Sequence, residues 1–173
     1  GAEVELADGQ TLRAQLVVAA DSRFSDTRRA MGIGADLHDF GKTMLVLRMR
    51  HEMPHEQVAW EWFGHGQTLA LLPLHDPHTS SVVLTLSPPA MREMLALDDA
   101  ALEQAMAERF EQRLGAMRVA GPRCAYPLVG VYAQRFMAER FALIGDAAVG
   151  MHPLTAHGFN FGLLGQDTLA GEM

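Results

Sequence analysis

The chain has 173 residues, of which 49% are apolar and 20% are charged, so it can bury a core and is neither a disordered nor a fibrous protein. Its Lys and Arg residues number 14 against 21 Asp and Glu residues, giving a net charge of -7 that leaves no basic surface for phosphates and excludes nucleic acid as an expected partner. A single cysteine, Cys124, excludes an internal disulfide and a CxxC motif, and we expect a cytoplasmic protein.

The first forty residues predict a hairpin followed by a strand, a polar turn and a helix. Residues 3–6 alternate in polarity and lead into an Asp-Gly turn, which is typical of a hairpin. The apolar run 16–20 predicts a strand buried on both faces, as in a parallel sheet. Ser25 then caps a short helix that runs to Met31, where a glycine follows.

The middle of the chain predicts an antiparallel sheet. Four apolar segments, 44–49, 57–63, 68–74 and 81–86, are separated by Gly, Pro, His and Asp residues at the spacing of neighbouring strands. Trp60 and Trp62 share one face of the second segment; they form either a wall for an aromatic substrate or part of the core.

A helix is predicted after the sheet. Pro88-Pro89 ends the sheet region, and Asp98 or Asp99 caps a helix that runs to Leu114 and carries an apolar residue at every fourth position. Two further short strands are predicted at 119–125 and 128–132. His51 and His55 have the i, i+4 spacing of a metal site, but the proline between them argues against one, and we expect no metal.

The last part of the chain predicts a second buried strand, a glycine-rich segment and a final helix. The strand covers 140–144 and ends in Gly145-Asp146, and the helix begins at about Phe159 and has an uncovered apolar face. These elements predict an α/β fold. Residues 1–38 and 139–173 would be parts of one domain, and residues 39–138 an inserted, mainly antiparallel domain.

The segment from the Gly-Asp pair to the final helix carries the strongest chemical signal. The strand places the Asp146 carboxylate at the carboxyl edge of a sheet, where it can accept a polyol or ribose hydroxyl. Pro153 fixes the backbone, and Gly158 permits close approach at the start of a helix whose free amides stabilise negative charge. Either element alone is also common in turns without function.

Together these features resemble the second FAD motif of the class A flavin-dependent monooxygenases. His152-Pro153 and residues 158–163 are similar to the form of the motif in the ubiquinone-biosynthesis hydroxylases. Residues 17–28 resemble the Asp-Gly motif of the same family, in which a buried strand is followed by Asp, a small residue, Ser and Arg.

The resemblance implies a partial FAD-binding Rossmann-like domain with an inserted substrate domain. It implies FAD as cofactor, NAD(P)H as co-substrate and hydroxylation by dioxygen of a small aromatic molecule, a prenylated phenol or quinol on the route to ubiquinone. Such a substrate makes peripheral association with the inner face of the membrane, or with a biosynthetic complex, an open expectation. No catalytic acid or base is identified. The cofactor-binding residues that the resemblance implies are Asp21, Arg28, Gly145, Asp146, Ala147, Pro153, His157, Gly158, Phe159 and Asn160.

The chain departs from the family pattern at three places. Ser22 stands where the family has Gly, Val149 where it has His, and Ala156-His157 where it has Gly-Gln. Ser22 and Val149 are tolerated if their backbone angles avoid positive φ. The family's GxGxxG motif is absent, so the resemblance covers the middle and later part of a full enzyme, and we expect an N-terminal part of the chain to be missing.

Several alternatives stay open. Asp21 is otherwise a helix-entry cap, and Arg28 a solvated surface charge. The chain is otherwise a same-fold reductase or halogenase; a halogenase should carry a lysine near the flavin, and Lys42 is the single lysine. A third alternative is a non-catalytic truncated piece, and we expect little or no oxidase activity from residues 1–173 alone.

Overall fold

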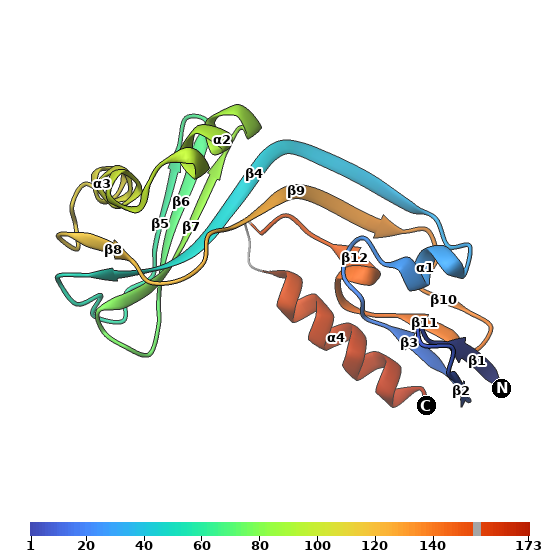
Figure 1. Ribbon diagram of the computed structural model, residues 1–173. Coiled ribbons are helices and arrows are strands. Elements are labelled where there is room, and N and C mark those ends of the chain that lie inside the picture. Colours follow the sequence, from blue (N-terminus) through green and yellow to red (C-terminus); the bar gives the residue numbers. More distant parts are fainter. Residues whose placement is uncertain (154–156) are drawn as a thin grey trace. The chain divides into compact units, whose positions relative to one another are not determined.

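The computed structural model describes residues 1–153 and 157–173, whose contacts group them into two compact units (Figure 1). Unit 1 comprises Gly1–Phe40 and Val129–Met173, and unit 2 comprises Gly41–Leu128. The domain boundaries expected after residues 38 and 138 stay a prediction; the contacts place residues 129–138 with unit 1.

The N-terminal hairpin of unit 1 forms as predicted. Strands β1 (Ala2–Glu5) and β2 (Thr11–Ala14) pair antiparallel, with Ala2 opposite Ala14. Gly9 adopts a φ of +83° in the connecting turn, a conformation that glycine reaches without steric cost.

A small sheet with a parallel pair lies at the centre of unit 1. Strand β3 (Val17–Ala19) pairs in parallel with β11 (Phe141–Leu143), and β11 pairs antiparallel with β10 (Met137–Ala138). The parallel pairing confirms the prediction from the apolar runs. Burial on both faces was wrong for β3, because alternate residues face opposite sides and Val18 is 40% exposed while Ala19 is buried.

Helix α1 (Asp26–Ala30) follows the first buried strand and confirms the predicted cap. The Ser25 hydroxyl accepts a hydrogen bond of 2.9 Å from the amide of Arg28, which satisfies one of the free N–H groups at the helix start. The helix ends at Met31, just before Gly32 with its φ of +65°.

The second half of unit 1 returns the chain to this sheet. After β11 come the 3-10 helix η1 (Gly145–Ala147), the short strand β12 (Val149–Gly150) and helix α4 (His157–Gly171). Helix α4 begins two residues before the predicted start at Phe159, and none of its residues is buried, so its apolar face is uncovered as expected. The core of the unit is small and consists of Ala19, Ile33, Ala133, Phe141, Leu143, Ala147 and Ala148.

Unit 2 contains the predicted antiparallel sheet. Its strands are β4 (Ala35–His51, of which Gly41 onward lies in this unit), β5 (Trp60–Gly64), β6 (Gln67–Pro73) and β7 (Thr79–Leu86). Their order is β4-β7-β6-β5, and all three pairings are antiparallel.

Two later strands differ from their predicted ranges. Strand β8 (Met117–Val119) pairs antiparallel with β4 and ends where the first of the two predicted strands begins. Strand β9 (Cys124–Ala133) covers the second predicted strand and extends it at both ends. The prediction at 119–125 is therefore largely wrong.

Helix α2 (Pro88–Ala96) differs from the prediction, in which the Pro-Pro pair ends the sheet region without starting a helix. Proline has no N–H to donate, and the first turn of a helix has no intrahelical acceptor for one, so Pro88 and Pro89 fit the start of this helix.

Helix α3 (Asp99–Arg109) is shorter than predicted. Asp98 caps it by accepting a hydrogen bond of 2.8 Å from the amide of Ala101. The helix stops before Leu114 because Glu111 and Gln112 adopt positive φ angles of 54° and 51°, which interrupt helical geometry.

The core of unit 2 is the larger of the two. Leu102, Met106 and Phe110 are at most 1% exposed and pack with buried side chains of β4, β6, β7 and α2 in one cluster, as the fourfold spacing predicted. Each such side chain contributes about 1.5–3 kcal/mol through burial of apolar surface.

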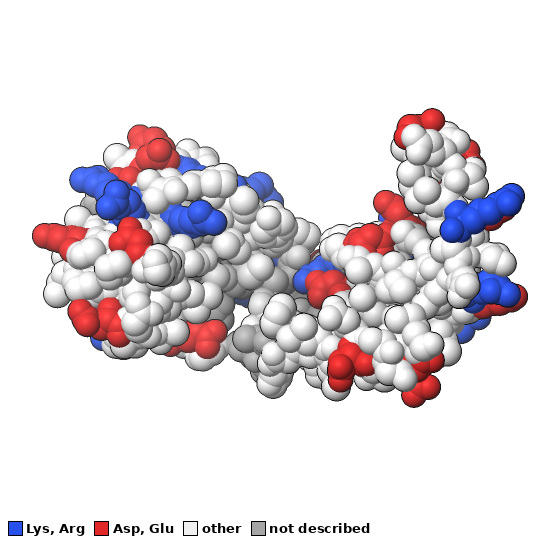
Figure 2. Space-filling model, turned by 90° about the horizontal axis from the view of Figure 1, so that it is seen from below, with Lys and Arg blue, Asp and Glu red and all other residues white. Residues whose placement is uncertain are grey.

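No helix within residues 1–153 and 157–173 has the length and apolar character needed to cross a bilayer. On the face shown in Figure 2, acidic and basic side chains occur in small groups between broad uncharged areas.

Candidate functional site

The centre of the candidate site is the turn that ends strand β11. Gly145 adopts a φ of +57°, in the left-handed region that favours glycine, and this reverses the chain into η1. Asp146 is the middle residue of η1, and its side chain is 35% exposed. The carboxylate therefore stands at the carboxyl end of the strand, as predicted.

Arg23 binds this carboxylate and was not among the predicted site residues. Its Nη2 donates to Asp146 Oδ2 at 2.7 Å, and its Nη1 donates to the carbonyl oxygen of Val129 at 3.0 Å. A signal was available in the sequence, because Arg23 lies inside the Asp21 motif and a carboxylate at a sheet edge favours a cationic partner.

Arg28 contacts the backbone of the turn η1, which carries Asp146. Its side chain is buried, with 4% of the residue exposed. Nη1 donates to the carbonyl oxygens of Ala147 at 2.8 Å and Arg23 at 3.2 Å, and Nη2 also donates to Arg23 at 3.2 Å. The alternative that Arg28 is a solvated surface charge is thus wrong. Arg28 joins the two motif segments through their backbones.

Asp21 caps the entry to helix α1. One carboxylate oxygen accepts from the Ser25 hydroxyl, and the other accepts from the Thr27 amide at 3.0 Å and the Thr27 hydroxyl at 2.8 Å. Burial raises the pKa of Asp21, but these hydrogen bonds to the charged form outweigh it and lower the pKa to about 2. The structure thus shows the helix-entry role that was the alternative for this residue.

Ser22 does not meet the condition of avoiding positive φ, whereas Val149 does. Ser22 has a φ of +76°, in the left-handed region that favours glycine, so its Cβ crowds the backbone. Val149 lies in strand β12 opposite Tyr132 and does not adopt a positive φ.

The N-terminal end of helix α4 lies in the same unit. His157, Gly158, Phe159 and Asn160 form its first turn, which contains no acidic residue and whose backbone N–H groups have no partner within the helix. Helix α4 contacts η1, and a Cβ built on Gly162 would lie 3.8 Å from Gly145 Cα.

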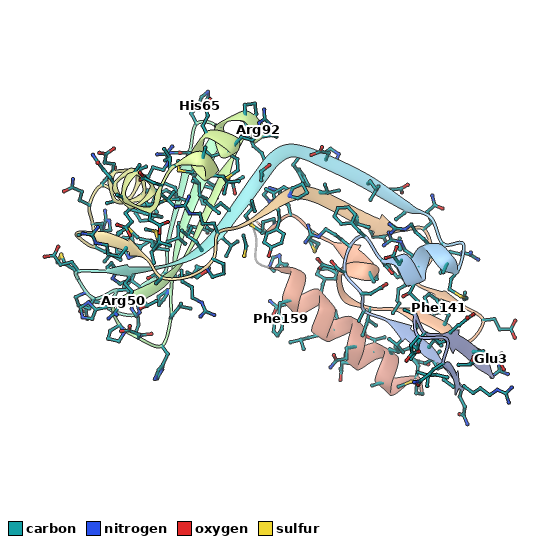
Figure 3. The ribbon with its side chains drawn as sticks, viewed as in Figure 1. Glu3, Arg50, His65, Arg92, Phe141 and Phe159 are labelled. Carbon is teal, nitrogen blue, oxygen red and sulfur yellow. The ribbon has the colours of Figure 1, made fainter. Side chains whose placement is uncertain are left out.

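The side chains of this first turn are open to solvent. Phe159 is 75% exposed and projects from the helix in Figure 3. A Cβ on Gly158 would meet no atom of the described residues within 4 Å. Pro153, the last described residue before the helix segment, is also exposed.

An apolar cavity of about 650 Å³ lies between α4 and the ends of β9 and β11. Gly145 and Gly162 line it, but the side chains of Asp146 and Arg23 do not. The cavity is therefore separate from the polar group around Asp146. Its apolar lining residues include Tyr132, Phe136, Leu143, Phe161, Leu164 and Leu169.

The two tryptophans are partly buried and pack against the core of unit 2. Trp60 and Trp62 stack with ring centroids 5.8 Å apart, and Trp62 packs edge-on against Phe110 at 5.3 Å. The guanidinium of Arg113 lies over both rings, 4.2 Å from the Trp60 ring centroid and 5.8 Å from that of Trp62. These contacts favour the core interpretation over a substrate wall.

Two buried histidines of unit 2 are engaged by protein groups. His51 and His55 are both buried, and each ring nitrogen of either residue lies within hydrogen-bond distance of a backbone or hydroxyl group. Within residues 1–153 and 157–173 no group of three or more His, Cys, Asp or Glu residues could hold a metal ion. Lys42, also in unit 2, donates to the carbonyl oxygen of Gly66 at 2.9 Å.

The arrangement in unit 1 suits a ligand that carries hydroxyl groups and a ring whose edge can take up negative charge. Asp146 supplies a fixed acceptor, and the first turn of α4 supplies amide donors at Gly158, where no described atom lies within 4 Å of an added Cβ. The residues present therefore fit the ribityl chain and the pyrimidine edge of a flavin.

Comparison with known proteins identifies the same cofactor class. The family described as "FAD binding domain" matches residues 2–170. The chain is 47% identical to the ubiquinone hydroxylase UbiM of Neisseria meningitidis over 98% of its length and 40% identical to the ubiquinone hydroxylase UbiL of Rhodospirillum rubrum over its whole length. It is 32% identical to the 3-demethoxyubiquinol 3-hydroxylase of Escherichia coli over 96% of its length.

The chain spans 36%, 40% and 42% of the lengths of these three relatives. Among solved structures, PqsL of Pseudomonas aeruginosa in complex with 2-aminobenzoylacetate superposes with a TM-score of 0.76 at 22% identity, over 93% of this chain and 46% of that one. The flavin-dependent brominase Bmp2 gives a TM-score of 0.73 at 15% identity, over 90% of this chain and 41% of that one. Both likenesses show a shared fold.

Proposed function

The chain belongs to the family of FAD binding domains, and from this premise we propose that it is part of a flavin-dependent monooxygenase. The proposed reaction hydroxylates the aromatic ring of a prenylated phenol or quinol in ubiquinone biosynthesis, with NAD(P)H as co-substrate. The names of three relatives that are 32–47% identical support this reaction. We further propose that the enzyme acts in the cytoplasm, at the inner face of the membrane.

The observation that carries the proposal is the Asp146 carboxylate held at the end of β11, in the turn η1 that contacts helix α4. Asp146 would bind hydroxyl groups of the flavin side chain. The amides of Gly158, Phe159 and Asn160 would face the ring edge that gains negative charge on reduction. When bound, FAD takes up the electrons of NAD(P)H and activates dioxygen. The protein supplies orientation, fixed dipoles and exclusion of water.

The proposal is tested by FAD titration, followed by the visible absorbance and fluorescence of the flavin. The longest natural polypeptide that contains residues 1–173 is compared with residues 1–173 alone. We expect tight binding with flavin bands in the longer polypeptide. In the shorter chain we expect weak binding and no NAD(P)H oxidation, because the GxGxxG phosphate loop is absent from these residues.

Two variants make this test specific to the site. Asp146→Ala should weaken FAD binding about 10- to 100-fold through loss of a charged hydrogen-bond acceptor. Asp26→Ala is the matched control, because Asp26 is an exposed carboxylate paired with Arg29 on helix α1. Equal affinity of the wild type and the Asp146 variant, or no flavin in the longer polypeptide, would exclude the proposed function.

A further inference from the structure

Arg23 binds the carboxylate of Asp146, the candidate flavin-binding side chain, with a fixed geometry. Two different nitrogens of its guanidinium bind two partners: Asp146 Oδ2 at 2.7 Å and the carbonyl oxygen of Val129 at 3.0 Å. Because the guanidinium is planar, two bonds from separate nitrogens define its plane. The Arg23 and Asp146 side chains are 25% and 35% exposed, so the pair is less screened by water than an ordinary surface ion pair.

Arg23 is itself anchored at its backbone and along its stem. Its carbonyl oxygen accepts hydrogen bonds from both terminal nitrogens of the buried Arg28. Its Cβ lies 3.1 Å from the position that a Cβ on Gly150 would occupy, so the stem passes close to strand β12 at a position where a larger residue would collide. The guanidinium therefore reaches Asp146 from a base with little freedom to move.

The contact with Arg23 gives the two carboxylate oxygens of Asp146 different roles. Arg23 engages Oδ2, which fixes the rotation of the carboxylate and leaves Oδ1 as the oxygen for a hydroxyl donor. A carboxylate already ordered before ligand binding loses less side-chain entropy when the ligand arrives. Without Arg23, η1 would present a freely rotating acid on a three-residue turn.

We propose that Arg23 is a positioning residue for flavin binding, which acts by orienting the Asp146 carboxylate toward a hydroxyl group of the cofactor. This inference rests on the proposed function. It assigns a role to a residue that the sequence analysis left out of the site.

The test is a double-mutant cycle on FAD affinity in the longest natural polypeptide that contains residues 1–173. Arg23→Gln should raise the Kd for FAD about tenfold in the wild-type background, and less than twofold in the Asp146→Asn background, because contacting residues are not additive. Arg23→Lys keeps the charge but cannot bind two partners through two separate guanidinium nitrogens, so its Kd for FAD should lie between those of the wild type and Arg23→Gln. Arg29→Gln is the matched control, since Arg29 lies on helix α1, six residues after Arg23, and pairs only with the exposed Asp26 in the described contacts.

A merely structural role would give another pattern. In that case Arg23→Gln would weaken FAD binding by the same factor in both backgrounds, and additive losses of this kind would overturn the inference while the proposed function stands. Failure of the wild-type polypeptide to bind FAD would overturn both. If Arg23→Gln does not fold, as judged by circular dichroism, Arg23→Lys takes its place in the cycle with the same criterion of additivity.

Discussion

The guanidinium of Arg28 donates a hydrogen bond of 2.8 Å to the carbonyl oxygen of Ala147, 119 residues further along the chain. This bond fastens helix α1 to the turn that carries Asp146. Arg28→Met should lower the free energy of unfolding by about 2–4 kcal/mol, because it leaves the buried carbonyls of Ala147 and Arg23 without their donors. Urea denaturation followed by far-ultraviolet circular dichroism measures the change.

Arg29→Met serves as the control for Arg28→Met. Arg29 follows directly on the same helix, but its side chain is exposed and pairs with the exposed Asp26, so the loss should stay below about 1 kcal/mol. Similar losses for the two variants would show that the buried contact to Ala147 contributes nothing.

Ser22→Gly should stabilise the protein. Ser22 holds a φ of +76°, which costs a residue with a Cβ about 1 kcal/mol relative to glycine. The greater freedom of glycine in the unfolded chain offsets part of this, so we expect a gain of about 0.5 kcal/mol in chemical denaturation. Ser87→Gly is the control, because Ser87 has an extended backbone with a φ of -62° and should gain nothing. A loss of stability in Ser22→Gly contradicts the strain argument.

Asp21 should make stability depend on pH in the acid range. Its pKa is about 2 in the folded chain against an ordinary value of 3.8, so the unfolded state binds more protons between these values. The stabilisation is complete above pH 3.8 and is lost as the pH falls toward 2. Asp21→Asn should therefore destabilise by about 1 kcal/mol at pH 7 and by much less near pH 2. A loss of stability in Asp21→Asn that does not change with pH would contradict this prediction. Asp167→Asn, at an exposed position of α4, is the control.

His51 should make unit 2 less stable in mild acid. Burial lowers its pKa below the ordinary 6.5, assisted by the nearby His55 and His78, against the opposing effects of the Met53 carbonyl and Asp76. The unfolded state then binds more protons below pH 6.5, so the free energy of unfolding falls as the pH drops through that value. Tryptophan fluorescence reports this, since both tryptophans lie in unit 2.

Two variants separate His51 from other titrating groups. His51→Gln should reduce the difference in stability between pH 7.5 and pH 5.5. His65→Gln, at an exposed histidine labelled in Figure 3, should leave that difference unchanged. An unaltered pH difference in His51→Gln would assign the acid sensitivity to another group.

The sequence predicted the elements whose signals are local. Three predictions depend on patterns that span only a few residues, and all were confirmed. They are the Ser25 cap, the strands of unit 2, and the core face formed by Leu102, Met106 and Phe110. The end of helix α3 was missed because Glu111 and Gln112 adopt positive φ angles although neither is a glycine, the residue that usually marks such a conformation in a sequence.

The site was predicted in part for the same reason. The Gly-Asp turn and the helix start are local patterns, whereas the link from Arg23 to Asp146 joins segments 123 residues apart and has no periodic signature. Arg28 was ambiguous because a short helix after a polar turn gives no indication of which of its faces will be buried. Asp21 and Ser22 show the limit of reasoning from motifs. The Asp21 carboxylate accepts hydrogen bonds from neighbouring residues of the helix start, and Ser22 adopts the positive φ that favours glycine although it has a side chain.

The discontinuity of unit 1 bears on how the protein is made. Residues 41–128 are continuous and leave the ribosome before residues 129–173, whereas β3 gains its parallel partner β11 only after they have emerged. Closing so long a loop is slow, and a parallel pair formed late leaves the edges of β3 exposed in the meantime. The nascent chain therefore passes through a stage in which the antiparallel sheet can be complete while β3 still lacks its partner β11, and the edge of β3 that β11 will cover is open to chaperones or to unwanted strand pairing.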